Sequence, residues 1–413
     1  MPADAMTRST ALAPTAPPTS APASARAVFR LLEGLRHGAL DVQLPDGASA
    51  QFGSPGGRRA AIRLHNWNVC AAALKAGDIG FAESFIAGDW SSPDLSALLE
   101  LLVANRDAVE SVIYGHWWGS VLHRVRHLLN RNSRRGSRRN IHAHYDLGNE
   151  FYRLWLDPTM NYSSAWFEGD RSRDLVGAQH AKVRRALAEC GVGPGDRVLE
   201  IGCGWGALAE FAAREFGATV TGVTLSSEQL AWAQRRLDAA GLPGDLRYQD
   251  YRELDRSEGE GRFDAVVSIE MFEAVGREYW PGYFATLSRQ LKADGRACVQ
   301  TITIRDDLFE RYVRSTDFIQ QYIFPGGLLP SDREFRAAAR RAGLEVVNTL
   351  DFGFDYAETL RRWRERFLAA DGAVRQLGFD TRFMRTWEFY LAYCEAAFAA
   401  GNTSVVQYTL RKG

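Results

Sequence analysis

A short apolar run that enters a glycine-rich turn constrains this chain more than any other feature. Residues Arg197–Ile201 read RVLEI, and Gly202, Gly204 and Gly206 follow at alternate positions. Glycine lacks a Cβ, so it tolerates positive φ and lets a backbone approach a ligand closely. The pattern predicts a strand, a tight turn and a helix, with a nucleotide-type cofactor at the turn. Glycine also serves ordinary turns, so the turn needs support from the rest of the chain.

The spacing of these glycines favours one class of cofactor. Dinucleotide-binding turns usually read G-x-G-x-x-G, whereas this turn reads G-x-G-x-G behind the acidic residue Glu200. The sequence therefore favours S-adenosylmethionine (SAM) over a dinucleotide.

Strands and helices alternate around the turn, which predicts an α/β fold with a doubly wound, Rossmann-like parallel sheet. Ligands of such sheets lie beyond the carboxyl ends of the strands. The later chain departs from the alternation, with an inserted helix over 311–324 and long aromatic helices over 355–370 and 382–399 that predict a helical cap. The expected strands are 197–201, 219–223, 245–249, 263–269, 296–304 and 404–410, and the expected ligand rim is 202–206, 224–229, 250–251 and 270–275.

Composition divides the chain into four parts. Residues 1–27 are rich in Ala, Pro, Ser and Thr without an apolar core, which predicts a disordered leader. A small mixed N-terminal domain, which could face lipid, is expected over 28–108, and the catalytic domain over 140–413. Between them, 109–139 is a basic amphipathic linker with Trp117 and Trp118 at its middle. This linker could lie in a lipid headgroup layer or could be a solvated interdomain segment.

Charge and cysteine usage exclude several functions. The 50 basic residues match the 50 acidic ones, so no overall field attracts nucleic acid. The five cysteines lack a C-x-x-C pair, which argues against a disulfide framework and a zinc site and favours a reducing cytoplasm. His142 and His144 have no third ligand at useful spacing, so no metal site is expected. The sequence has no apolar run long enough to span a membrane.

From about residue 140 to the C-terminus, and more weakly over 28–105, the sequence resembles the cyclopropane-fatty-acyl-phospholipid synthase family, which includes the mycolic acid cyclopropane synthases. The resemblance implies a SAM-dependent methyltransferase that acts on double bonds of unsaturated phospholipid acyl chains. It also implies a cytoplasmic protein held peripherally at the inner membrane surface, possibly as a homodimer. The motifs that carry it are 145–149 (YDLGN), 162–163, 198–206, 222–226 with Gln229, 249–251, 271–273 and 322–327.

Carried over residue by residue, the resemblance implies a SAM pocket. Many methyltransferases have an acid at the end of the second strand, whereas this chain has Val223-Thr224-Leu225-Ser226 there, so hydroxyls and Gln229 would replace it. The implied pocket residues are Tyr162, Ser163, Glu200, Gly202, Cys203, Gly204, Trp205, Gly206, Thr224, Leu225, Ser226, Gln229, Asp250 and Tyr251.

The resemblance also implies a bicarbonate ion bound by Ser164, Glu273, Gln300, Ile302 and Tyr356. Ser164 replaces the family's usual Cys, and Gln300 replaces its usual His, although an amide can still donate a hydrogen bond to an anion. The implied catalytic residues are Glu273, Tyr356, Gln300 and Cys394, and Cys394 could equally be a buried structural thiol.

Three functions therefore stay open. The first is a cyclopropane synthase, in which a base such as bicarbonate removes a proton from the added methyl group and closes the ring. The second is a methyltransferase that loses the proton elsewhere and gives a methyl- or methylene-branched lipid, which the change at Gln300 favours. The third is a non-catalytic lipid-binding protein that keeps the fold.

Overall fold

The computed structural model describes residues 21–54, 56–109, 147–254 and 261–413. The chain forms two compact units, divided at residue 120 within the expected linker, and each is described by itself. The linker's tryptophans and arginines, and His142 and His144, lie outside the described residues. The expected leader is too long, because helix α1 (Ala23–Leu32) begins before residue 27 and buries Ala25, Phe29 and Leu32 on one face.

The N-terminal unit is a small mixed α/β fold built on a four-stranded sheet of order β2-β1-β3-β4. The indole of Trp90 is fully buried, stacks on Phe81 and donates a hydrogen bond to the Ser84 hydroxyl. Trp90 and Phe81 therefore serve the packing of this unit. The elements after α1 are β1 (Ala39–Gln43), β2 (Ser49–Gly53), β3 (Arg59–Leu64), α2 (Asn68–Ala87), β4 (Trp90–Ser91) and α3 (Leu95–Ala104).

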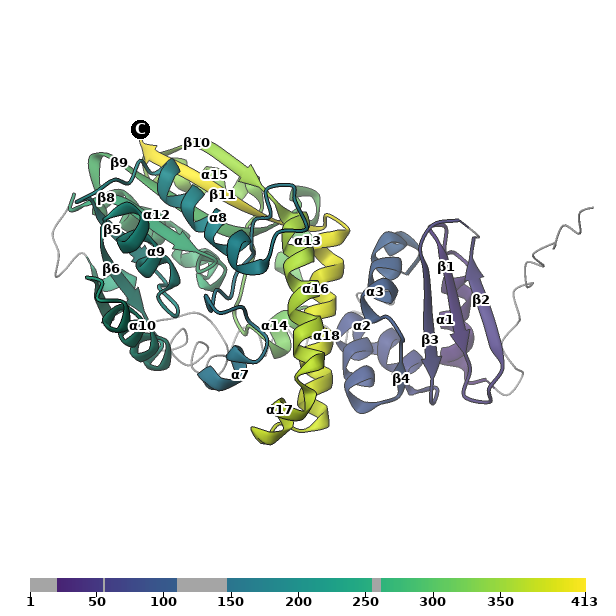
Figure 1. Ribbon diagram of the computed structural model, residues 1–413. Coiled ribbons are helices and arrows are strands. Elements are labelled where there is room, and N and C mark those ends of the chain that lie inside the picture. The colour runs from purple at the N-terminus through teal and green to yellow at the C-terminus, as the bar shows by residue number, and fades with distance from the viewer. Residues whose placement is uncertain (1–20, 55, 110–146, 255–260) are drawn as a thin grey trace, which may run out of the picture. The chain divides into compact units, whose positions relative to one another are not determined.

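The second unit contains a seven-stranded sheet of order β10-β11-β9-β8-β5-β6-β7 (Figure 1). The expected doubly wound sheet is confirmed, with one exception to its parallel order. Strand β11 lies between β9 and β10 and runs antiparallel to both of them. The strands are β5 (Arg197–Ile201), β6 (Thr219–Thr224), β7 (Asp245–Tyr248), β8 (Phe263–Ile269), β9 (Leu291–Ile304), β10 (Leu344–Asp351) and β11 (Thr403–Lys412).

Alternation along the central strands builds a hydrophobic core on each face of the sheet. On β5, Leu199 and Ile201 pack with the cluster that contains α12 (Trp280–Gln290) and α15 (Asp332–Arg341), whereas Val198 packs with the opposite cluster. Successive side chains of a strand point to opposite faces, so one apolar strand serves both cores. The opposite cluster contains α8 (Leu175–Glu189), α9 (Ala207–Phe216) and Leu237 of α10 (Ser227–Ala240).

A helical cap follows the sheet, as expected, but its first part is divided. The expected single helix over 311–324 is wrong, because α13 (Asp306–Arg314) ends before a new helix, α14 (Phe318–Tyr322). Asp317 starts α14 with a capping box shared with Gln320, which satisfies the new helix's first amides. The long helices α16 (Gly353–Ala369) and α18 (Thr381–Ala399), joined through α17 (Asp371–Gln376), pack side by side (Figure 1).

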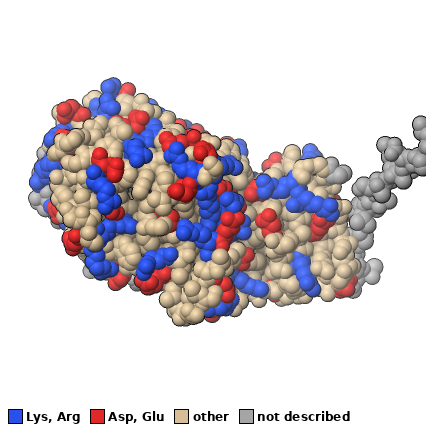
Figure 2. Space-filling model, in the orientation of Figure 1, with Lys and Arg blue, Asp and Glu red and all other residues tan. Residues whose placement is uncertain are grey.

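Basic and acidic side chains are interspersed on the face of the molecule shown in Figure 2, in keeping with their equal totals. Many of them pair on one helix, as Arg336 does with Asp332 and Arg375 with Asp371. Among the described helices, none is long and apolar enough to cross a membrane.

The central sheet is packed tightly enough to reject one methyl group at Gly222. A Cβ there would lie 2.7 Å from Leu246 Cδ2 and 2.9 Å from Cys203 Cβ, whereas one at Gly282 on α12 would meet nothing within 4 Å. We expect Gly222→Ala to lower the free energy of unfolding by about 1–3 kcal/mol through overpacking. The matched variant Gly282→Ala should raise it by up to about 1 kcal/mol. Denaturant unfolding measures both, and equal effects would contradict the packing argument.

Candidate active site

The first functional cavity lies beyond the carboxyl ends of β5, β6 and β8, where a doubly wound sheet is expected to bind its ligand. Its volume is about 180 Å³. Eleven of the fourteen predicted SAM-pocket residues line it: Tyr162, Ser163, Glu200, Gly202, Cys203, Gly204, Trp205, Thr224, Leu225, Gln229 and Tyr251.

The other three predicted residues support the wall of this cavity. A Cβ on Gly206 would lie 2.8 Å from Ala233 Cβ, so this glycine lets α9 approach α10 closely. Ser226 caps the first turn of α10. Asp250 forms an ion pair with Arg252, which itself lines the cavity. These three residues shape the cavity indirectly, through the helices and the ion pair that form its wall.

The glycine turn needs residues without a side chain. Gly202 and Gly204 have φ values of 90° and 50°. The amides of Gly202 and Cys203 both donate to the carbonyl of Val223, which ties the turn to β6. A Cβ on Gly204 would meet no protein atom within 4 Å and lies at the cavity wall. Backbone at this point is therefore open to a ligand.

One buried acceptor in this cavity fits SAM. Glu200 is only 4% exposed, and its Oε2 atom has no hydrogen-bond partner among the described residues. Burial raises the pKa of Glu200 well above its usual range. SAM carries an ammonium group and ribose hydroxyls that can donate to such an acceptor, so the residues present suit this cofactor.

A second cavity of about 220 Å³ adjoins the first. Its wall is mostly apolar and aromatic, with Phe324, Tyr390, Tyr393 and Phe398 from the cap among its residues. Tyr162, Glu270 and Ala274 line both cavities. A group bound in one cavity can therefore meet a group bound in the other at these three residues.

The carboxylate of Glu270 collects the donors that were expected to hold bicarbonate. Its Oε1 atom accepts from the Ser164 amide at 2.8 Å and from Gln300 Nε2 at 2.7 Å. Its Oε2 atom accepts from the Tyr356 hydroxyl at 2.8 Å. Sequence reasoning placed Glu270 on the ligand rim but gave it no role.

Further polar contacts hold the residues around Glu270 in place. Gln407 on β11 donates to Gln300 Oε1 at 3.0 Å and to the carbonyl of Lys182, and Arg185 donates to Gln407. Lys182 is fully buried and donates to the Ser163 hydroxyl. Burial lowers the pKa of Lys182 to about 8, although the charge of Glu270 opposes that shift. The sequence does contain a signal for Lys182, since it is one of four lysines among 50 basic residues.

Glu273 lines the second cavity with a different set of contacts. Its Oε1 atom accepts from the Thr301 hydroxyl and the Ile302 amide, whereas Oε2 has no hydrogen-bond partner in the part of the chain that the structure describes. Burial, followed by the charge of Glu270, raises the pKa of Glu273 to about 8. Glu273 is therefore a neutral carboxylic acid near neutral pH.

Cys394 lines the second cavity, as its position in the expected catalytic set requires. Burial raises the pKa of its thiol well above the usual range, which keeps the sulfur protonated and weakly nucleophilic. These properties favour a role in the cavity wall.

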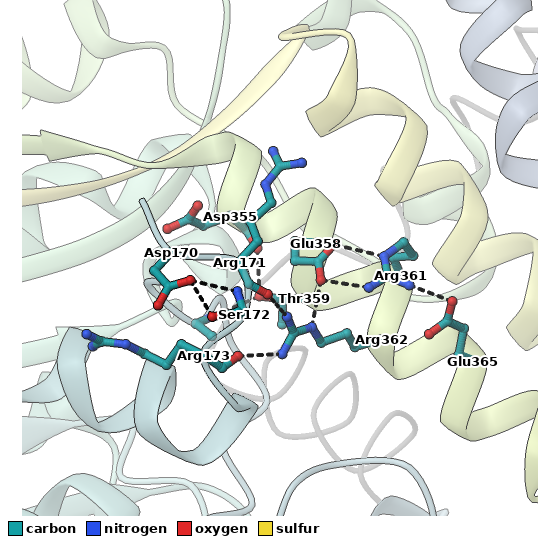
Figure 3. Close-up of polar contacts among 11 residues, drawn as sticks. Asp170, Arg171, Ser172, Arg173, Asp355, Glu358, Thr359, Arg361, Arg362 and Glu365 are labelled. Carbon is teal, nitrogen blue, oxygen red and sulfur yellow. Dashed lines mark hydrogen bonds and ion pairs between the residues drawn. The ribbon is translucent and has the colours of Figure 1, made fainter. Parts of the chain in front are cut away.

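Helix α16 holds residues 165–173, the segment that follows Ser163 and Ser164, and Figure 3 shows its contacts with Arg171 and Arg173. Arg362 donates to the carbonyls of Arg171 and Arg173 and pairs with Glu358. Hydrogen bonds to Arg361, and then to Arg362, lower the pKa of Glu358 to about 2, so the anchor stays charged.

Two backbone contacts extend this anchor toward the site. The amide of Phe167 donates to Asp355, and the amide of Ala165 donates to the Thr359 hydroxyl. Tyr356 lies between Asp355 and Thr359 on the same helix. One helix therefore positions two of the three donors to Glu270.

Comparison with known proteins identifies the family. The family model described as mycolic acid cyclopropane synthetase matches residues 132–408. The chain belongs to this family. Its structure also resembles that of the mycolic acid cyclopropane synthase CmaA1 complexed with SAH and CTAB, with a TM-score of 0.61 and 33% identity over 67% of this chain and 98% of that one.

Two curated relatives extend the match into the N-terminal unit. Tuberculostearic acid methyltransferase UfaA1 of Mycobacterium tuberculosis is 39% identical over 94% of this chain and 92% of its own length. Cyclopropane-fatty-acyl-phospholipid synthase of Escherichia coli K12 is 35% identical over 87% of this chain and 89% of its own length. This cyclopropane synthase family member is thus a SAM-dependent enzyme that transfers a methyl or methylene group to fatty acyl chains.

The glycine turn generates a prediction about cofactor affinity. We expect Gly204→Ala to weaken SAM binding at least about tenfold, roughly 1.4 kcal/mol, because the new methyl group enters the cavity. Gly241→Ala is the control: Gly241 also has positive φ, 63°, and open space around its Cβ position, but it ends α10 outside the cavity. Calorimetric titration measures both, and equal affinities in the two folded variants would remove the turn from the site.

The raised pKa of Glu273 predicts how stability depends on pH. Between about pH 4.5 and 8 the folded protein holds a proton on Glu273 that the unfolded chain has released, so this residue makes stability fall as pH rises. Glu273→Gln removes the titration. Its stability relative to wild type should therefore increase from pH 5 to pH 8, by on the order of a few kcal/mol. Denaturant unfolding at both pH values tests this, and a constant difference would mean that Glu273 is ionised throughout.

Proposed function

We propose that this enzyme methylates the double bond of an unsaturated phospholipid acyl chain and that loss of a proton then closes a cyclopropane ring. The junction of the two cavities at Tyr162, Glu270 and Ala274 is the observation that carries the proposal. A cavity with open glycine backbone and a buried acceptor, suited to SAM, and a more apolar cavity suited to an acyl chain meet there, beside a carboxylate. A phospholipid substrate is supported by the name of the Escherichia coli relative.

The residues of the first cavity would hold and orient SAM. Glu200, the glycine turn, Thr224 and Gln229 supply acceptors and open backbone for its polar groups. When bound, SAM supplies an electrophilic methyl group. An alkene is a weak nucleophile, so the wall residues contribute mainly by positioning the chain at a short, aligned distance.

The second cavity would protect the cation that methyl transfer leaves on the acyl chain. Its aromatic residues exclude water, and their electron-rich faces stabilise a nearby positive charge. Tyr356 and Tyr390 lie in this wall, and the Tyr390 hydroxyl is hydrogen-bonded to that of Tyr162 at 2.7 Å. Cys394 would add a neutral, polarisable contact.

A methylene branch is the second candidate product. The relative named tuberculostearic acid methyltransferase and the Gln300 amide in place of the family's usual imidazole favour it. Ring and methylene branch both form when the added methyl group loses one proton, for the branch after a hydride has shifted so that the cation lies on the carbon that bears the methyl group, so they are isomers. A saturated methyl branch would need a hydride donor in addition, and no such group belongs to the proposed reaction.

We further propose that the enzyme meets its lipid at the cytoplasmic surface of a membrane, as a peripheral protein and a possible homodimer. The apolar character of the second cavity supports an acyl chain as the occupant. Retention of the protein by unsaturated phospholipid vesicles in a flotation assay would support the surface contact.

Labelled SAM tests the reaction. We expect the purified enzyme, supplied with unsaturated phospholipid vesicles and SAM carrying a trideuterated methyl group, to yield a lipid that has gained one carbon and kept all but one deuterium. Ring closure and methylene formation both remove one hydrogen from the added methyl group. Mass spectrometry counts the deuterium, and nuclear magnetic resonance separates the ring from the branch. Retention of all the deuterium would mean that the proton leaves from another carbon.

A paired substitution tests which cavity receives the acyl chain. Ala397 on α18 lines the second cavity, whereas the nearby Ala400 is exposed at the end of this helix. Ala397→Phe should lower product formation at least about tenfold by displacing the chain from its aligned position, with SAM binding unchanged. Ala400→Phe should leave both unchanged. Full activity of Ala397→Phe would place the chain elsewhere.

A further inference from the structure

We propose that the side chain of Glu270 is a built-in base, which takes the proton from the methylated acyl chain and replaces the bicarbonate ion expected from the family resemblance. This inference rests on the proposed function. It assigns a catalytic role to a residue of this chain and makes the reaction independent of a dissolved ion.

The contacts of Glu270 match those expected for the missing base. Ser164, Gln300 and Tyr356 were three of the five residues expected around bicarbonate, and all three donate to the Glu270 carboxylate at 2.7–2.8 Å. The fourth expected donor, the Ile302 amide, is engaged by Glu273. Bicarbonate would have to displace Glu270 and add another negative charge beside it, so this site does not fit the ion.

The backbone at Glu270 is held in an uncommon conformation to place this side chain. Its φ of 50° lies in the left-handed region, which a residue with a Cβ adopts at a cost. Its amide donates to the carbonyl of Gln300 at 2.8 Å, so the strained residue is tied to the strand that supplies one of its donors. Glycine could adopt this conformation without strain, so the glutamate is explained by its side chain and not by its backbone.

Neighbouring charges favour an ionised Glu270 and a neutral Glu273. Burial is the largest effect and raises the pKa of Glu270 above its usual range, while the charge of Lys182 and the three hydrogen bonds oppose that rise. Burial and the negative charge of Glu270 both raise the pKa of Glu273. Two carboxyl groups in one site whose surroundings separate their protonation states can serve as base and acid.

The proposed step is balanced in atoms and charge. After methyl transfer the acyl chain carries a carbocation next to the carbon that bears the new methyl group. A C–H bond of that methyl group breaks, its proton bonds to a carboxylate oxygen of Glu270, and its electron pair forms the third C–C bond of the ring. Carbocation and carboxylate become a neutral lipid and a neutral carboxylic acid. Loss of the proton to water after product release restores Glu270.

A purely structural role for Glu270 makes different predictions. In that case its carboxylate would only balance the buried charge of Lys182, and the enzyme would still need an external base. Removing the side chain would then cost stability and would not create a new response to bicarbonate.

Bicarbonate dependence of the wild type is the first test. We expect full activity in buffer freed of carbon dioxide, with no stimulation by added bicarbonate, and no bicarbonate binding by calorimetric titration of the SAM-loaded protein. Bicarbonate binding, or activity that requires bicarbonate, overturns the proposal. Because the titration does not need turnover, it remains informative if the phospholipid is the wrong substrate, and absence of any lipid product would count against the proposed function alone.

Substitution of Glu270 is the second test. Glu270→Gly removes the carboxylate, opens its space and suits the positive φ, so we expect product formation to fall at least about a hundredfold and to recover in part with added bicarbonate. Glu270→Gln should lose activity similarly without recovery, because the amide still fills the space. Glu345→Gln is the control for the loss of a carboxylate: Glu345 on β10 pairs with Arg411 and lines neither cavity, so activity should be retained.

The outcomes separate the two roles. Recovery of Glu270→Gly by bicarbonate, together with bicarbonate binding that the wild type lacks, supports the built-in base. Full activity of Glu270→Gln contradicts it. If Glu270→Gly is unfolded by circular dichroism, Glu270→Gln and the wild-type titration still decide the question.

Discussion

The active site depends on one buried carboxylate that four separate segments hold in place. Glu270 follows β8, Gln300 lies on β9, Tyr356 lies on α16, and Ser164 lies in the segment that α16 anchors. A carboxylate removed from bulk water requires such donors, because an uncompensated buried charge is strongly unfavourable. The sheet and the cap therefore meet around Glu270, which is one of the three residues that line both cavities.

The two cavities that meet at Glu270 are lined by different groups, and each lining suits a different proposed ligand. The cavity proposed for SAM has open glycine backbone and the buried acceptor Glu200, which suit a charged cofactor. The second cavity has aromatic walls and a neutral Glu273, so in the proposed reaction Glu273 would not compete with Glu270 for the cation. In a site of low polarity a single carboxylate acts strongly on a nearby positive charge. Keeping the proton on Glu273 therefore concentrates the negative charge at Glu270.

Local features were the ones that the sequence predicted well. The glycine turn and the apolar strands follow from short patterns, in which each residue's role depends on its neighbours in the chain. The family resemblance supplied the eleven predicted pocket residues that line the first cavity. The division between α13 and α14 was missed because Asp317 works as a cap only through its contact with Gln320. The reversed direction of β11 could not be read from its apolar pattern, which is the same for either direction.

The roles of Glu270, Lys182 and Gln407 were missed for another reason, since each depends on contacts between residues far apart in sequence. Considered on its own, Gln300 stands where the family usually has an imidazole. Beside Glu270 the amide fits, because its Nε2 donates to the carboxylate while its Oε1 accepts from Gln407. It does so without a second titrating group at the site, whereas an imidazole would gain or lose charge near neutral pH. The amide and the glutamate are therefore best understood as one unit, in which each residue explains the presence of the other.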